Sequence, residues 1–131
     1  MTMIVRERHA RNEALETHAP SAALFHGLAD PTRLMILDHL RTGEHKVKDL
    51  TEHLGLAQST VSAHLSCLRD CGLVTSRAVG RSSMFSLANP GLLSMILDGA
   101  ANYIASSTAL GLDDHDFSEV HGPHQDREAG L

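Results

Sequence analysis

The stretch from Ser59 to Val74 constrains the fold of this chain more than any other segment. At about 100° per residue, a helix over these positions gathers Val61, Leu65 and Leu68 into one apolar stripe that must face a core. Beside that stripe lies a small polar face without bulk, which can enter a DNA groove. Its members are Ser59, Ser62 and Ser66.

The segments before this helix complete a helix-turn-helix pattern. Asp30 as N-cap and Pro31 at the first helical position predict the start of a helix that stops at Gly43. A third short helix is predicted over 47–54, and Gly55 opens a tight connection into the next helix. Two helices joined by a short glycine-containing turn are typical of DNA-binding proteins.

The periodicity changes after Gly72, where two strands are predicted over 73–78 and 82–87, with a hairpin tip at 79–81. A last helix opens at Asn89-Pro90 and carries an apolar arc too wide for one thin domain, so we interpret it as a dimerisation helix. The predicted fold is mainly α with a β-hairpin wing, a winged helix-turn-helix that forms a homodimer through its terminal helices.

Three segments follow from this reading. Residues 1–19 form an N-terminal arm, residues 20–105 a winged helix-turn-helix domain for DNA binding and dimerisation, and residues 106–131 an acidic, His-containing tail. The first helix of the domain is predicted to begin at Ala19-Pro20.

The net charge of −5 would argue against DNA binding if it were spread evenly over the chain, but it is not. Residues 1–20 hold three Arg and three Glu, residues 21–89 seven basic and six acidic side chains, and residues 90–131 one basic and seven acidic. The acid is concentrated in the tail, so the overall charge does not exclude a DNA face.

Three further features of the sequence concern location. No run of about 18 apolar residues occurs, so no membrane span is expected. The N-terminus lacks the apolar region of a secretory signal. Two cysteines in one helix fit a reduced, cytoplasmic dithiol better than a disulfide.

Candidate DNA contacts come from the helix-turn-helix and the wing. Base edges are expected to meet the N-terminal half of the second helix, at Gln58, Ser59, Thr60 and Ser62. Phosphate contacts are expected from basic side chains around it, at Lys46, Lys48, Arg77 and Arg81. The predicted partner is double-stranded operator DNA.

Cys67 and Cys71 lie one helical turn apart, so both sulfurs can reach one ion. Thiolates select soft or borderline metals such as Cd(II), Pb(II) and Zn(II) over Mg(II) or Ca(II). The alternative is that both are small packing residues of the helix. His64 shares their face and is a less certain ligand.

Several motifs together resemble the ArsR/SmtB family of winged-helix metal-responsive repressors. They are LADPTRL at 28–34, LGL at 54–56, STVS at 59–62 and His64-Leu65. The segment 64–74 more narrowly resembles the CmtR-type cadmium and lead sensors. The resemblance implies a dimer that binds its operator and releases it when metal binds two recognition-helix cysteines and a third cysteine near the C-terminus.

The chain departs from that family at its metal ligands. It has no third cysteine, and Leu34 and Met35 stand where other members carry thiols. The last helix also lacks the acidic and histidine ligands of the family's interprotomer site. His115 is the donor nearest to where the third cysteine would fall, and His121 and His124 are less certain alternatives.

The sequence therefore predicts a repressor that releases DNA when a soft divalent metal, Cd(II), Pb(II) or Zn(II), binds the recognition-helix dithiol. The alternative is a thiol redox switch on the same scaffold, in which Cys67 beside His64 is oxidised. A zinc enzyme would need an open metal position beside a general base. The sequence contains no such constellation, so no enzyme is expected.

Overall fold

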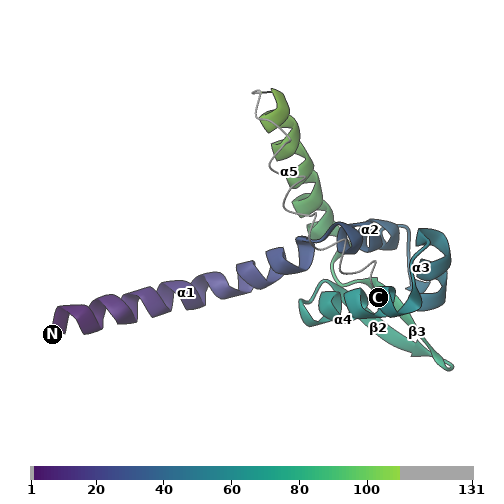
Figure 1. Ribbon diagram of the computed structural model, residues 1–131, viewed down its shortest axis with the longest axis horizontal. Helices are drawn as coiled ribbons and strands as arrows, with labels where there is room; N and C mark the ends of the chain where they lie inside the picture. The colour runs from purple at the N-terminus through teal and green to yellow at the C-terminus, as the bar shows by residue number, and fades with distance from the viewer. Residues whose placement is uncertain (1, 110–131) are drawn as a thin grey trace. The chain divides into compact units, whose positions relative to one another are not determined.

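A computed structural model describes residues 2–109 of the chain. In this part the elements follow one another as α1 (Thr2–Leu28), α2 (Pro31–Leu40), β1 (His45–Lys46), α3 (Val47–Leu54), α4 (Gln58–Asp70), β2 (Val74–Val79), β3 (Ser82–Leu87) and α5 (Pro90–Ala109) (Figure 1). The described residues divide into two units between Asn89 and Pro90, and each unit is described by itself.

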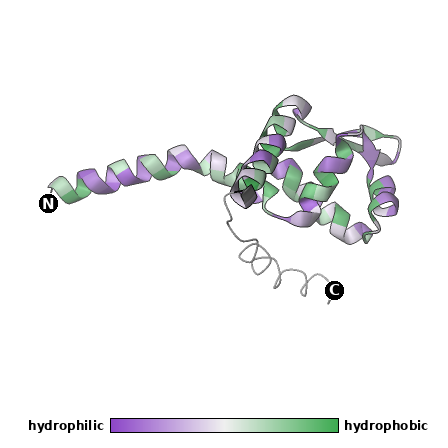
Figure 2. Ribbon diagram, turned by 90° about the horizontal axis from the view of Figure 1, so that it is seen from above, coloured by the Kyte–Doolittle hydropathy of each residue, from purple (hydrophilic) through white to green (hydrophobic). Residues whose placement is uncertain are grey.

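Helix α1 is much longer than the sequence predicted. It begins at Thr2 instead of Ala19 and contains Pro20 in its interior. Proline cannot donate a backbone hydrogen bond to the preceding turn, which is why the sequence favoured a helix start there. Figure 2 shows polar and apolar positions mixed along this helix. Its large apolar side chains that are more than half exposed are Met3, Ile4, Val5, Leu15 and Phe25.

The start of α2 is confirmed. The Asp30 carboxylate accepts a hydrogen bond from the backbone N–H of Arg33 at 2.9 Å, and proline occupies the first turn. The helix ends at Leu40, three residues before the predicted stop at Gly43, whose N–H donates to the Leu40 carbonyl. The Arg33 guanidinium donates to the carbonyls of His26 and Gly27, both at 2.8 Å, and so ties α2 to the last turn of α1.

The helix-turn-helix formed by α3 and α4 is confirmed. Gly55 ends α3 in the left-handed region, with φ of +68°, which a residue with a side chain rarely adopts. Helix α4 ends at Asp70 and is shorter than the predicted helical stretch. Its helical hydrogen bonding continues one residue further, because the Cys71 N–H donates to the Cys67 carbonyl at 3.0 Å. Gly72, at φ +77°, then turns the chain towards the wing.

The wing is an antiparallel hairpin of β2 and β3, as predicted. Val79 pairs with Ser82, so the tip consists of Gly80 and Arg81 and is one residue shorter than predicted. The two-residue strand β1 was not predicted. It pairs with β3 through His45 and Phe85, which gives the sheet the order β1-β3-β2.

The core of the first unit lies between α2, α3, α4 and the sheet. The predicted stripe of α4 is confirmed, since Val61, Leu65 and Leu68 are at most 1% exposed. The remaining buried apolar side chains of this unit are Ile36, Leu37, Leu40, Leu50, Leu73, Val74, Phe85 and Leu87. This packing fixes the orientation of α4, and therefore of both its polar face and its cysteines.

Helix α5 belongs to the second unit and is apolar over much of its surface. Four of its large apolar side chains are more than half exposed: Leu92, Met95, Tyr103 and Ile104. Within residues 2–109, no helix combines the length and the apolar character that crossing a membrane requires.

Candidate DNA-binding face and metal centre

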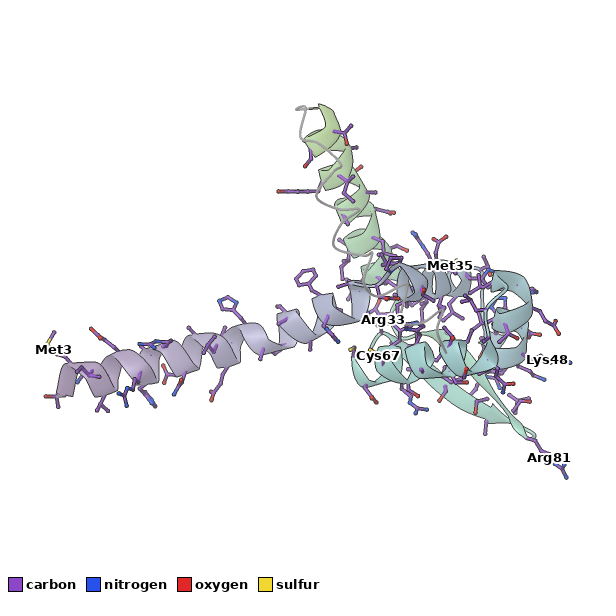
Figure 3. All side chains as sticks on the ribbon, viewed as in Figure 1. Met3, Arg33, Met35, Lys48, Cys67 and Arg81 are labelled. Atoms are coloured by element: carbon purple, nitrogen blue, oxygen red, sulfur yellow. The ribbon has the colours of Figure 1, made fainter. Side chains whose placement is uncertain are left out.

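Four of the predicted DNA contacts line one hollow. It has a volume of about 440 Å³ and lies where α3, the start of α4 and the wing meet. Its lining includes Lys46, Lys48, Gln58 and Arg81, together with Ser82 and Ser83 of β3. Figure 3 shows Lys48 on α3 and Arg81 at the hairpin tip, both directed away from the core. Three cations and several hydrogen-bonding groups around one concavity suit a phosphate backbone.

The other predicted base-reading residues follow Gln58 along α4. Ser59 and Ser62 are exposed, and Thr60 is half-buried. They occupy the first two turns of the helix, whose free backbone N–H groups also attract anions. The polar face predicted from the sequence is therefore accessible at the end of α4 that borders the basic hollow.

Arg77 is held by an ion pair that the sequence did not reveal. Its guanidinium donates two hydrogen bonds to the Glu44 carboxylate, at 2.8 and 3.0 Å. The hydrogen bond to Arg77 lowers the pKa of Glu44, and the same bond raises the pKa of Arg77. The two residues are 33 positions apart, so no local pattern could predict their pairing. Arg77 is therefore already paired with a carboxylate, and it would have to leave Glu44 to contact a DNA phosphate.

Cys67 and Cys71 lie together at the opposite end of α4. Both are half-buried free thiols, and their side chains are hydrogen-bonded to each other. Burial raises the pKa of Cys71, and the neighbouring Cys67 raises it further, whereas the positive charge of Arg33 opposes the shift. Two neighbouring thiolates repel each other, and a bound dication would remove that penalty. The donor set fits a soft metal ion.

The last turn of α1 packs directly on this thiol pair. Gly27 is buried, and a Cβ added to it would lie 3.2 Å from the Cys71 sulfur and 2.9 Å from a Leu73 methyl group. Figure 3 shows Cys67 in the last turn of α4, and the charge of Arg33, at the start of α2, acts on the neighbouring Cys71. A ligand on the two sulfurs would therefore touch the recognition helix and sit beside α1.

The predicted histidine ligands have different positions. His64 is buried, and its Nε2 lies 3.9 Å from the Asp30 carboxylate. His115, His121 and His124 lie outside the described residues. A group of three histidines that the sequence analysis did not single out is present in residues 2–109: His39, His45 and His53. They come from three different elements, so no spacing along the chain could indicate them.

A helix-turn-helix, a hairpin wing and a basic hollow between them define a winged-helix DNA-binding protein. Residues 30–76 match the family described as "Bacterial regulatory protein, arsR family". A probable mercury resistance operon repressor of Streptomyces lividans is 39% identical over 98 residues, which are 74% of this chain and 77% of that protein. The chain belongs to the ArsR family of bacterial transcriptional regulators, as its motifs predicted, and is not an enzyme.

Two further regulators and one solved structure are also similar to this chain. The transcriptional regulator NmtR of Mycobacterium tuberculosis is 39% identical over 112 residues, which cover 84% of this chain and 92% of NmtR. The regulator CmtR of the same organism is 50% identical over 68 residues, or 52% of this chain and 58% of CmtR. A homodimeric winged helix-turn-helix DNA-binding domain from Mycobacterium bovis has a TM-score of 0.62 at 30% identity, over 72% of this chain and 88% of that one.

Proposed function

We propose that this chain is a homodimeric repressor that releases operator DNA when Cys67 and Cys71 bind a soft divalent metal, Cd(II), Pb(II) or Zn(II). The observation that carries the proposal is the pair of contacting thiols at one end of the helix whose other end borders the basic hollow. Metal chemistry and DNA reading thereby share one rigid element. The name of the mercury resistance operon repressor is consistent with this chemistry.

Homodimerisation is supported by the exposed apolar side chains of α1 and α5. A long helix whose apolar groups face water gains little stability from its own hydrogen bonds and needs a tertiary partner. Phe25 on α1 is 60% exposed and Met95 on α5 is 70% exposed. A second copy of the chain supplies matching apolar surfaces, and a two-fold dimer would place two copies of α4 on successive major grooves.

Release of DNA follows from where the metal would bind. Two thiolates would hold the ion, and donors from the C-terminal tail, His115 first and His121 or His124 next, would complete its coordination. The ion would tie the end of α4 to the tail, beside the last turn of α1 that packs on Cys71. A small change in the spacing of the two recognition helices is sufficient to weaken binding to two adjacent major grooves.

A redox switch at the same cysteines is less well supported. Reactive thiols have a lowered pKa, because the thiolate is the nucleophile. The pKa of Cys71 is instead raised, first by burial and then by Cys67. We assign the protein to the bacterial cytoplasm, the compartment in which such thiols stay reduced.

The test is DNA binding with and without Cd(II), using the DNA directly upstream of the gene that encodes this chain. Fluorescence anisotropy should show affinity falling 5–150-fold on addition of Cd(II), which corresponds to a coupling of about 1–3 kcal/mol. Cys67→Ser and Cys71→Ser should bind DNA as tightly as the wild type but no longer respond to Cd(II). Ser66→Ala, on the polar face of the same helix, is the matched control. It is judged by the fold-change that Cd(II) causes, which should equal that of the wild type. Equal Cd(II) responses in all four proteins would exclude the dithiol as the sensor.

A further inference from the structure

Three histidine rings from separate elements meet on the surface of the first unit. His39 lies in the last turn of α2, His45 in strand β1 and His53 in the last turn of α3. Their ring centroids are separated by 4.5, 4.9 and 5.6 Å. One nitrogen from each ring lies within 4.8 Å of the nitrogens offered by the other two. Three imidazole rings that converge in this way can coordinate a single metal ion.

We propose that His39, His45 and His53 form a second metal site, which binds a borderline divalent ion such as Zn(II) and does not involve the cysteines. Imidazole nitrogen suits Zn(II), Cu(II) and Ni(II), whereas Cd(II) and Pb(II) favour thiolate more strongly. Three protein nitrogens leave a fourth position for water or another donor. This site does not depend on the proposed dithiol sensor.

The distances require only small movements. The Nε2 of His39 and the Nδ1 of His53 are 2.8 Å apart. Two nitrogens bound to one tetrahedral zinc at about 2.0–2.1 Å lie about 3.3 Å apart, so this pair must open by about half an ångström. The rings of His39 and His45 are half-buried and that of His53 is exposed, so they have room to adjust.

A hydrogen bond to the backbone fixes the tautomer of His45 in the form that can bind a metal through Nε2. Its Nδ1 lies 2.8 Å from the carbonyl oxygen of Gly43. A carbonyl oxygen accepts hydrogen bonds and cannot donate them, so Nδ1 carries the proton and the lone pair is on Nε2. A backbone carbonyl that fixes the tautomer of a metal-binding histidine is a common outer-shell arrangement.

The other two rings share a single hydrogen bond that a metal would replace. One of the two facing nitrogens carries the proton, and on metal binding that proton moves to the second nitrogen of the same ring. Burial and the neighbouring His45 and His53 lower the pKa of His39, while Asp38 opposes the shift. A lowered pKa favours the neutral ring, which is the form that binds metal.

The site would fasten the helix-turn-helix to the edge of the wing sheet. Strand β1 pairs with β3, and α3 is the first helix of the DNA-binding motif. Lys46, which follows His45 directly, lines the basic hollow. An ion bound by the three rings would hold α2, β1 and α3 in the arrangement that presents this hollow, and would stabilise the folded protein by mass action.

The experiment uses full-length protein in which Cys67→Ser and Cys71→Ser are combined, so that thiols cannot bind the probe. Co(II) is titrated in and followed by its visible absorption, and Zn(II) binding is then measured by displacement of Co(II). We expect one equivalent per protomer, with no thiolate-to-metal charge-transfer band. His53→Gln or His45→Gln in this background should weaken Co(II) binding more than about 100-fold, beyond the 10–100-fold typical of losing an outer-shell partner.

His18→Gln, which removes an exposed histidine of α1, is the matched control and should bind Co(II) normally. Circular dichroism and DNA binding verify that each variant is folded, and two independent ligand variants guard against failure of one of them. Absence of binding in the double cysteine variant would overturn the proposal. Binding that survives both His53→Gln and His45→Gln would also overturn it, because the ion would then be held by other histidines.

Discussion

Replacing Asp30 by alanine should destabilise the first unit through the start of α2. The Asp30 carboxylate accepts the N–H of Arg33 at 2.9 Å, and its loss leaves that donor without its cap. Removing such a cap costs about 1 kcal/mol, within a range of about 0.5–2. Helix α2 supplies three core side chains that are at most 2% exposed, Ile36, Leu37 and Leu40, so fraying at its start is transmitted to the core. A loss of about 1 kcal/mol lowers the unfolding midpoint of a domain of this size by roughly 4–8 °C.

The assay is thermal unfolding followed by circular dichroism, at one fixed protein concentration because a dimer's midpoint depends on it. Asp30→Asn is the control, since asparagine caps helices about as well as aspartate. It should retain most of the stability, although it loses the negative charge that lies 3.9 Å from the His64 ring. A midpoint for Asp30→Ala equal to that of the wild type would refute the role assigned to the cap.

Three further predictions concern the two faces of the first unit. Glu44→Gln should free the Arg77 guanidinium to contact a DNA phosphate. The slope of log DNA affinity against log salt concentration should then steepen by about one unit. An unchanged slope would mean that Arg77 does not reach DNA. Gly27→Ala should lower the free energy of unfolding, measured by urea titration, by about 1 kcal/mol. The added methyl group overpacks the contact with Cys71 and Leu73, which costs about 1–3 kcal/mol and exceeds the gain in helix propensity. A more stable variant would contradict the close contact between Gly27 and these side chains. Cd(II) affinity should rise by at least about tenfold per pH unit near neutrality, because the pKa of Cys71 is raised and the ion must displace the proton of this thiol. An affinity that does not change with pH, measured by competition with a chelator, would indicate that Cys71 does not bind the ion.

The elements that the sequence predicted well are those whose signals are local. Asp30 and Pro31 mark the start of α2 within two residues, and Gly55 marks the end of α3 because its backbone needs a positive φ. The buried stripe of α4 follows from helical periodicity alone. Contact between Cys67 and Cys71 was likewise predictable, because residues four apart meet on one helix face.

The length of α1 and the contacts between distant residues could not be predicted from the sequence. Pro20 was interpreted as a helix start, although a long helix can accommodate one missing hydrogen bond. The pairing of Arg77 with Glu44 and the convergence of His39 and His53 both arise from tertiary packing. No periodicity connects such residues before the fold is known.

The proposed function requires that Cys67 and Cys71 bind the inducing metal. The most direct measurement is a titration of the reduced protein with Cd(II), followed by ultraviolet thiolate-to-metal absorption, for the wild type, Cys67→Ser and His115→Ala. We expect a band that saturates near one ion per protomer in the wild type, disappears in Cys67→Ser and weakens in His115→Ala. A wild-type protein without the band, or a Cys67→Ser protein with the full band, would contradict it.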